Sequence, residues 1–334
     1  MADGNVLTQS YAISSEDRGA ELDRALREAI SWVRLEVHFK ASSDGVLKGN
    51  VGGAFRRTFS DALRRISENV KDRAPTAYHY IIETLRPAET PVLRASVEAP
   101  RSFVLRPPPS PTTFWRGDLI PFEVVLIGRS LDFLPEVVAA LQLMGQGGIG
   151  SSHVPCALRA LWQPSATDKP RLLFDGAVVV DDPEPERLAS YPEDRQRDDV
   201  TLHFLSPARI IVDGGLRQRS LSFSDLLRAL FRRVSTLAAF HGNGVLDLDF
   251  GALIERAATV SQWQKAFASE GSAPSLGRDP GDSLQRGFLG KVRYVGPELS
   301  ALMPIIRLGE ALHVGKGTAH GAGRYVVSAS PSIT

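Results

Sequence analysis

The sequence predicts an α+β fold of two tandem ferredoxin-like domains, each with the element order βαββαβ. Two observations predict it: residues 31–165 and residues 200–330 each follow that plan, and both end in a helix, a glycine-rich loop and a strand. A length of 334 residues also favours two domains over one. Residues 1–30 are expected to form an N-terminal extension, and residues 166–199 an acidic, proline-rich connection.

In the first half, residues 32–41 alternate apolar and polar side chains, which predicts a half-buried strand. Residues 52–70 carry apolar side chains at helical spacing and arginines on another face, which predicts an amphipathic helix. We then expect a strand ending in a proline-rich loop (101–120), a strand (121–128), a helix running into glycines (130–150) and a strand (151–162).

The connection holds ten Asp or Glu residues against five Lys or Arg residues over 163–200, and it contains one short predicted strand. The second half repeats the plan of the first. We expect a strand (200–212), a helix (222–240) with Ser222 or Ser224 as N-cap, an extra helix (249–267), a strand (287–296), a helix (298–315) and a last strand (323–329).

The composition is that of an ordinary globular protein, with 43% hydrophobic and 23% charged residues. The single cysteine, Cys156, has no partner for a disulfide within the chain, and no Cys/His group has zinc-finger spacing. The N-terminus lacks the basic-then-apolar order of a signal peptide, and no apolar run approaches the roughly 20 residues of a membrane helix. We therefore expect a cytoplasmic protein with no membrane segment, no metal and no cofactor.

Charge is distributed unevenly, although the net charge is only +1. Residues 40–73 hold eight basic against four acidic residues, and residues 205–235 hold six against two. Basic patches of this kind can bind nucleic-acid phosphates, because affinity follows the local field rather than the total charge. Arginine-rich helix faces that are merely solvated give the same pattern, so charge alone leaves both interpretations open.

The stretch 308–327 is rich in glycine and suggests a phosphate loop. It fails the P-loop test, because the glycine spacing is wrong, Gly317 rather than Ser or Thr follows Lys316, and a strand follows instead of a helix. It also fails the dinucleotide-binding test, which needs a strand, glycines and then a helix. His313 and His320 have no acidic or thiol ligand beside them in sequence. Either the loop backbone approaches a phosphodiester chain, or the glycines cap a helix and turn the chain.

Residues 287–327 resemble the C-terminal signature of the CRISPR-associated repeat-processing endoribonucleases, a branch of the RAMP superfamily. The resemblance rests on GFLGKVRYVG and LGEALHVGKGTAHGAGRYVV, of which the closing LHVGKGT…GxGRY pattern is the most specific part. Four earlier segments fall in the family's order: RSFVLRPPPS, PFEVVLIGRSLDFLPEVVAALQLMGQGGIGS, LHFLSPARIIV and FSDLLRALFRRVSTLAAFHG.

The chain departs from that family in two places. Related sequences carry a cysteine cluster between the first helix and the next strand, where this chain reads VKDRAPTAYHYIIETL. They often carry an R-Y-S-x-R-Q-like segment after a tryptophan, and here the residues after Trp263 keep only Arg278, Gln285 and Arg286 of it. The resemblance therefore does not extend to a structural metal in the first domain.

The resemblance implies a defined reaction and defined partners. Two ferredoxin-like domains grip the stem-loop of a CRISPR repeat transcript and cut it once per repeat, without a metal ion. The ribose 2′-OH upstream of the scissile phosphate attacks, leaving a 2′,3′-cyclic phosphate and a 5′-OH. The implied partners are the repeat RNA, the mature guide-RNA hairpin and other subunits of a CRISPR effector complex.

Such a cut needs a base, an acid and a cation beside the phosphate, and histidine suits either proton role. In the family the catalytic histidine lies near the end of the first strand or just after it. The loop here, residues 41–55, holds no histidine, so His38 on the polar face of the first strand is the nearest candidate, with Lys40 and Lys48 as possible partners. His241, in a predicted loop, is a second candidate. His38 can also be a sheet-face residue paired with Glu36, and a third possibility is that no histidine is correctly placed.

The expected RNA contacts come from both halves of the chain. They are Arg56, Arg57, Gly148, Gly150, Arg232, Arg233, Arg286, Gly315, Lys316, Gly317 and Arg324. The glycines would let the RNA backbone approach closely, and the cations would meet phosphates. For each arginine the alternative is a solvated face or an ion pair between the domains.

Two other functions stay open at this stage. A non-cleaving subunit that holds the guide hairpin is favoured by the missing histidine after the first strand. It shares salt-sensitive hairpin binding with the nuclease but does not cut. A metabolic ferredoxin-like enzyme or ligand-binding module would need a compact apolar pocket, for which the sequence offers no sign.

Overall fold

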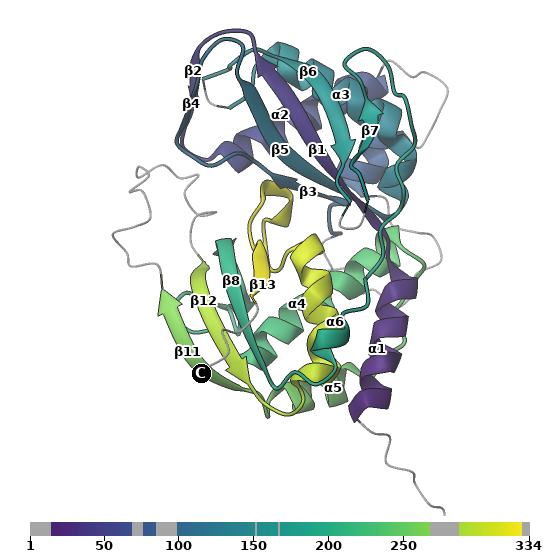
Figure 1. Ribbon diagram of the computed structural model, residues 1–334, viewed down its shortest axis with the longest axis vertical. Coiled ribbons are helices and arrows are strands. Elements are labelled where there is room, and N and C mark those ends of the chain that lie inside the picture. Colours follow the sequence, from purple (N-terminus) through teal and green to yellow (C-terminus); the bar gives the residue numbers. More distant parts are fainter. Residues whose placement is uncertain are drawn as a thin grey trace, which may run out of the picture.

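The computed structural model describes residues 15–68, 76–84, 99–150, 152–165, 168–267 and 287–328. The chain forms a mixed fold of helices and antiparallel sheets, with one large sheet in each half (Figure 1). Two hydrophobic clusters make up its core, and each is built mainly from one half of the chain.

The first half is a five-stranded antiparallel sheet of order β3-β5-β1-β6-β7, with helices α2 and α3 packed on one face (Figure 1). The bounds are β1 Trp32–Ala41, α2 Val51–Glu68, β3 Phe103–Arg106, β5 Leu119–Ile127, α3 Leu134–Gly147, β6 Cys156–Gln163 and β7 Arg171–Phe174. Two short strands, β2 (Gly45–Leu47) and β4 (Thr112–Phe114), pair separately. The first predicted strand and helix are confirmed as β1 and α2. They pack together through Phe39 of β1 and Phe55 of α2, which both contact Phe122 edge-on.

The second half is a four-stranded antiparallel sheet of order β11-β12-β8-β13, whose strands correspond in position to β3, β5, β1 and β6. The bounds are β8 Asp199–Ala208, β9 Ile211–Val212, β10 Gly215–Leu216, α4 Phe223–His241, α5 Phe250–Ala257, β11 Ser261–Phe267, β12 Phe288–Val295, α6 Leu299–Leu312 and β13 Tyr325–Ser328. Ser222 caps α4, since its Oγ accepts the Asp225 N–H at 3.1 Å, which confirms one of the two predicted caps.

One predicted element is wrong. Residues 249–267 do not form a single extra helix, because α5 ends at Ala257 and residues 261–267 continue as strand β11. The strand lies at the sheet edge and pairs only with β12, from Ser261 opposite Val295 to Phe267 opposite Gly290. Pairing with a distant segment therefore overrides the local helical pattern.

The two halves interlock. Helix α1 (Ser15–Ala29), in the predicted N-terminal extension, runs along α6 of the second half (Figure 1), and its Leu22 and Leu26 belong to the second core. Conversely, Ala319 from the C-terminal glycine-rich stretch belongs to the hydrophobic cluster of the first half. Apolar surface is thus shared between the halves, which gives the junction between them a fixed geometry.

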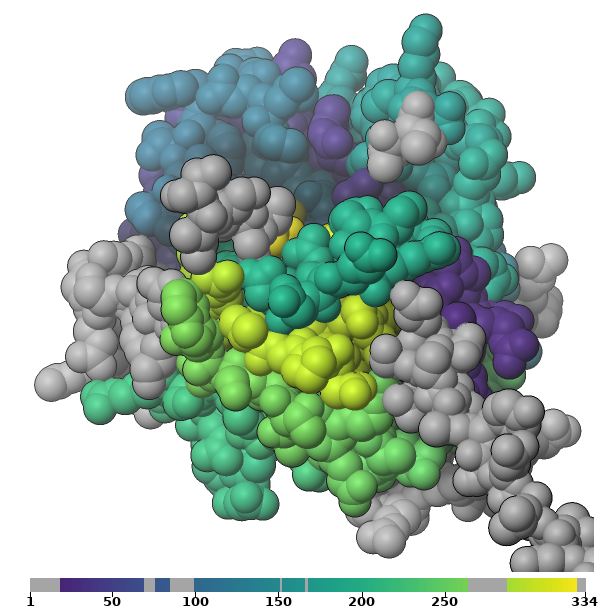
Figure 2. Space-filling model, turned by 60° about the horizontal axis from the view of Figure 1, so that its bottom comes forward, coloured from purple at the N-terminus to yellow at the C-terminus, as the bar shows by residue number. Residues whose placement is uncertain are grey.

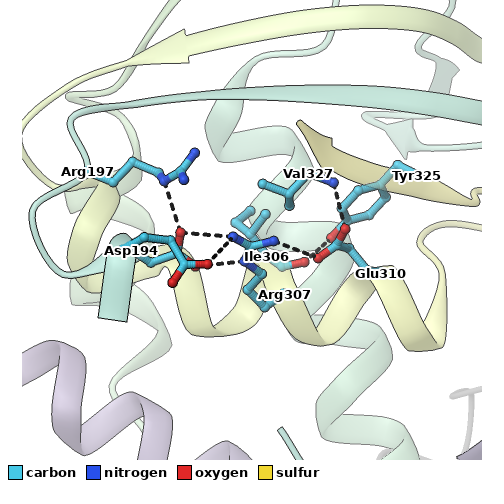
Figure 3. Close-up of polar contacts among 8 residues, drawn as sticks. Asp194, Arg197, Ile306, Arg307, Glu310, Tyr325 and Val327 are labelled. Atoms are coloured by element: carbon cyan, nitrogen blue, oxygen red, sulfur yellow. Dashed lines mark hydrogen bonds and ion pairs between the residues drawn. The ribbon is translucent and has the colours of Figure 1, made fainter. Parts of the chain in front are cut away.

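The acidic connection crosses one face of the second half. Figure 2 shows it in teal, lying over α6 in yellow and close to α1 in purple. Asp194 fixes it there: its carboxylate accepts from Arg307 Nε (2.7 Å) and Nη2 (3.0 Å) and pairs with Arg197 (Figure 3). Glu310, next to Arg307 on the helix, accepts the Val327 N–H at 2.6 Å and so extends this network to β13. None of the described helices is both long and apolar enough to cross a membrane.

Candidate nucleic-acid interface

The glycine-rich loop between α6 and β13 is fixed at its start by an arginine from the first half. Arg106 Nη2 donates to the carbonyl oxygens of Glu310 (2.9 Å) and Ala311 (3.1 Å) at the end of α6. Its Nε donates to Nε2 of His313 at 2.9 Å, and His313 Nδ1 then donates to the Ala322 carbonyl across the loop at 3.1 Å. A cation at a helix C-terminus is favourable because the last carbonyls lack helical partners.

Arg233 also serves this helix end. Its side chain is 9% exposed, and Nε donates to the Leu312 carbonyl at 2.7 Å. Burial lowers the pKa of its guanidinium to about 9. The guanidinium of Arg233 is therefore not exposed for the RNA contact that the sequence predicts. Its neighbour Arg232 is exposed on α4.

The loop glycines meet the protein's own backbone rather than open space. A Cβ on Gly315 would lie 2.6 Å from the Arg209 carbonyl oxygen, and one on Gly323 would overlap the Val314 carbonyl oxygen. Both have positive φ, 86° and 72°, as do the other predicted glycines at positions 148, 150 and 317. The space beside Gly315 is thus filled by the backbone of residue 209, which follows β8, and the approach of an RNA backbone stays a prediction.

This loop lies between the two sheets. On one side it follows the end of β8, where the Lys316 N–H donates to the Arg209 carbonyl at 2.9 Å and Ser206 Oγ donates to the Gly321 carbonyl at 2.6 Å. On the other side, the short turn Thr318–His320 packs against the start of α2, where a Cβ on Gly52 would overlap the His320 carbonyl oxygen. Figure 1 shows this loop in yellow, below β3.

Arg56 and Arg57 from α2 and Arg209 after β8 lie close enough to His320 of the loop to affect its pKa, and Lys316 of the same loop donates its N–H to the Arg209 carbonyl. We call these five residues the basic junction. Burial lowers the pKa of His320 to about 4, and the charges of Arg56, Arg209 and Arg57 act in the same direction. Burial, Arg101 and Arg57 also lower the pKa of Arg56, against a smaller opposite effect of Asp61. Within the described residues, no ion pair of 4 Å or less involves Arg56, Arg57, Arg209 or Lys316.

Several polar atoms of the basic junction have no partner. Nε of Arg56, Nε of Arg209 and Nδ1 of His320 are buried and accept or donate no hydrogen bond to any part of the chain that the structure describes. A buried unpaired polar atom costs about 1–3 kcal/mol, so a group of them beside uncompensated cations favours a bound anion. A phosphodiester oxygen suits the two guanidinium nitrogens, and the imidazole nitrogen can donate or accept according to its tautomer.

The predicted catalytic residues lie elsewhere. His38 is on the face of β1 opposite the one that α2 covers, and its Nε2 lies 2.6 Å from Glu36 Oε1. Lys48 is exposed in the turn between β2 and α2. The sheet therefore separates His38 from the arginines of α2, and the alternative of a sheet-face pair with Glu36 describes what His38 does in this structure.

The remaining predicted residues are scattered. Arg324 pairs with Glu123 at 3.6 Å, and Arg286 lies outside the described residues. Gly150 of the first glycine-rich loop contacts Leu47, so both glycine-rich loops touch the segment that leads into α2. Sequence reasoning missed Arg209 and His320, although both lie in segments that carry the family resemblance.

A cavity of about 560 Å³ lies apart from the basic junction, between α1, the connection and α6, with Tyr191, Asp194 and Arg307 in its wall. None of the predicted site residues lines it. Among the residues that the structure describes, no group of three or more His, Cys, Asp and Glu side chains is placed to hold a metal ion.

Two family models match the chain. A model described as an N-terminal domain matches residues 30–185, and the model of the CRISPR-associated endoribonuclease Cas6 matches residues 202–325. No curated protein matches the sequence at a significant level.

Solved structures resemble the whole chain. A Cas6 (TTHA0078) product complex has a TM-score of 0.50 at 18% identity and covers 90% of this chain and 100% of its own. A product complex of the Thermus thermophilus Cas6 (TTHB231) has a TM-score of 0.51 at 14% identity, covering 89% and 99%.

A partial Cas6-RT-Cas1–Cas2 complex reaches a TM-score of 0.53 at 13% identity and covers 92% of this chain and 48% of the longer one. At these identities the likeness shows a Cas6-like fold, and the family model adds sequence evidence over the second half. The second half of the chain therefore matches the Cas6 family of CRISPR-associated endoribonucleases in sequence, and the chain as a whole has a Cas6-like fold.

Proposed function

We propose that this protein binds the stem-loop of CRISPR repeat RNA at the basic junction and cleaves the precursor transcript without a metal ion. The 2′-OH upstream of the scissile phosphate attacks, leaving a 2′,3′-cyclic phosphate and a 5′-OH. One observation carries the proposal: the basic junction gathers cations from both halves, holds unpaired polar atoms, and makes no ion pair of 4 Å or less within the described residues. Such a site suits an RNA backbone, whose phosphates supply the missing negative charge.

The architecture supports the same substrate. We interpret the two halves as tandem ferredoxin-like domains, because equivalent strands have the same antiparallel order in both sheets. In that interpretation, α2 occupies the first helical position of its domain, and the glycine-rich loop precedes the last strand of the second. RNA at the junction would contact both domains at once. A cytoplasmic location, expected from the sequence, goes with this substrate.

The test is cleavage of a labelled repeat RNA from the neighbouring array in the presence of EDTA. A second substrate carries a 2′-deoxy substitution at the cut site. We expect a single cut in the first RNA and none in the second, because the attacking oxygen is missing. Cleavage of the deoxy substrate, or dependence on an added metal ion, would contradict the proposed mechanism.

A second function is a non-cleaving subunit that holds the guide hairpin. The observation favouring it is that residues 41–55 contain no histidine and that His38 pairs with Glu36 on the far side of the sheet. Partner proteins are proposed on the likeness to the Cas6-RT-Cas1–Cas2 complex. Tight, salt-sensitive binding of the repeat without any cut would establish this alternative. His38 and Lys48 stay predicted catalytic residues of the cut.

A further inference from the structure

His320 differs from the other histidines in what surrounds it. Both ring nitrogens of His313 have hydrogen-bond partners, in Arg106 and the Ala322 carbonyl. Nε2 of His241 lies 2.8 Å from the Pro100 carbonyl, and His38 pairs with Glu36. His320 has a buried Nδ1 with no hydrogen-bond partner of normal geometry in the described chain, and the charges that lower its pKa, all positive, outweigh a contact with the Gly317 backbone that raises it. Of these four imidazoles, it is the one whose unsatisfied atom calls for a ligand.

The backbone holds His320 firmly in this position. The turn Thr318–His320 lies between Gly317 and Gly321, whose φ angles are 80° and 89°. The His320 N–H donates to the Gly317 carbonyl at 2.9 Å, and the His320 carbonyl packs on the start of α2 at Gly52. The imidazole is therefore positioned by main-chain contacts on both sides, as a residue with a geometric task needs to be.

The protonation state of His320 suits one role. With a pKa of about 4, the imidazole is neutral near pH 7 and has a free lone pair. A bound phosphate would offset the charges of Arg56 and Arg209 and so raise the basicity of the ring when the RNA is in place. A neutral imidazole beside a phosphate held by arginines can accept a proton from a neighbouring hydroxyl.

We propose that His320 is the general base of the cut, taking the 2′-OH proton while Arg56 and Arg209 hold the non-bridging oxygens of the scissile phosphate. This inference rests on the proposed function. The 2′ oxygen forms a bond to phosphorus as its proton passes to the imidazole, and the P–O5′ bond breaks with its electron pair on O5′. O5′ takes a proton from solvent water, and the imidazolium later returns its own proton to solvent.

The test compares His320→Gln with His38→Gln in single-turnover cleavage of the repeat RNA. Glutamine keeps a polar side chain of similar size but cannot act as a base. We expect the rate constant to fall about 10²- to 10⁴-fold in H320Q, and by a smaller factor in H38Q, which removes the rival candidate for the base. Both variants should bind the 2′-deoxy repeat within about threefold of wild type, which separates chemistry from binding and folding. Added imidazole should partly restore cleavage in His320→Gly.

Each other outcome has a definite meaning. If H320Q binds normally and cleaves within tenfold of wild type, or if H38Q is the variant that loses cleavage, the role of His320 is wrong while the nuclease function stands. If H320Q fails to bind the deoxy repeat and imidazole does not rescue His320→Gly, His320 is structural and the inference is overturned. If wild type binds the repeat but never cuts it, the proposed function fails first and the inference falls with it.

Discussion

Arg106 on β3 of the first half donates a hydrogen bond of 2.9 Å from Nε to Nε2 of His313, the residue that ends α6 in the second half. The bond fixes the tautomer, since Nε2 accepts and Nδ1 must carry the proton that it donates to the Ala322 carbonyl. Both side chains are buried, at 8% and 0% exposed. One pair thus joins the halves and sets the direction in which the glycine-rich loop leaves the helix.

Replacing Arg106 by Met should lower the free energy of unfolding by about 3–5 kcal/mol, because it leaves His313 Nε2 and the last carbonyls of α6 without their donor and removes the nearer of two cations from Glu123. Arg106→Lys should have a free energy of unfolding between those of wild type and Arg106→Met. It keeps the positive charge, but an ammonium cannot donate in the planar, forked geometry of a guanidinium. Urea unfolding measures both. Arg232→Met, on the exposed face of α4, is the control and should stay within about 0.5 kcal/mol of wild type. A loss below 1 kcal/mol for R106M would contradict this account of the junction.

Gly52→Ala tests the contact between α2 and the turn that carries His320. A methyl group there would overlap the His320 carbonyl oxygen, so the helix or the loop must shift, at about 1–3 kcal/mol of stability. We also expect cleavage to slow, because the basic junction is assembled across this contact. Gly147→Ala is the matched control: nothing lies within 4 Å of its Cβ position, so stability should hold or rise by up to about 1 kcal/mol. Equal thermal melting of the two variants would refute the tight contact.

Most of the fold could be predicted from the sequence, because burial on one face leaves a periodic signature. Residues 32–41 alternate since α2 covers one side of β1, and the α4 pattern follows its apolar stripe. Strand β11 could not be predicted in this way. Its residues, SQWQKAF, continue the pattern of α5, and only pairing with β12 makes them a strand.

The site was less predictable, for two different reasons. Arg233 lies three residues after Leu230 and four before Leu237 on the buried stripe of α4, so helical phase could have shown that it faces inward. Arg56 and His320, in contrast, come from opposite halves of the chain and meet only through packing. No local pattern contains that contact, and a lone histidine among glycines has no distinguishing signal.

The arginines of the basic junction should govern the salt dependence of RNA binding. Arg56→Met and Arg209→Met should each lower the slope of log affinity against log salt by about 1, because each removes one phosphate contact. Filter binding of the 2′-deoxy repeat over a range of salt concentrations measures the slope. Arg64→Met on the same helix is the control, since Arg64 already lies 3.8 Å from Asp61 and 3.7 Å from Glu68. Equal slopes for R64M and R56M would show that the RNA lies elsewhere.

Stability should decrease as the pH falls from about 6.5 to 4. Burial lowers the pKa of His241 to about 4, so over this range the unfolded chain takes up a proton that the folded chain excludes. Above pH 6.5 both states are neutral and His241 has no effect on the pH profile. His241→Gln should therefore flatten part of the slope below pH 6.5, by up to about 1.4 kcal/mol per pH unit, when unfolding is followed in urea. If the slope of unfolding free energy against pH is the same in His241→Gln and wild type, the imidazole of His241 is exposed to solvent rather than buried.

Arg56→Met should raise the pKa of His320. After burial, the charge of Arg56 is the largest cause that lowers this pKa, so its removal shifts the titration from about 4 towards the ordinary value of 6.5. NMR titration of the imidazole Cε1–H measures the shift, with His320→Gln to assign the signal and Arg64→Met as a charge control. If the pKa of His320 rises in both Arg56→Met and Arg64→Met, the cause is the net charge of the protein rather than the proximity of Arg56. If it rises in neither, Arg56 does not lie close to His320. If the acid limb of the cleavage–pH profile moves with the NMR value, the same imidazole takes part in the chemistry.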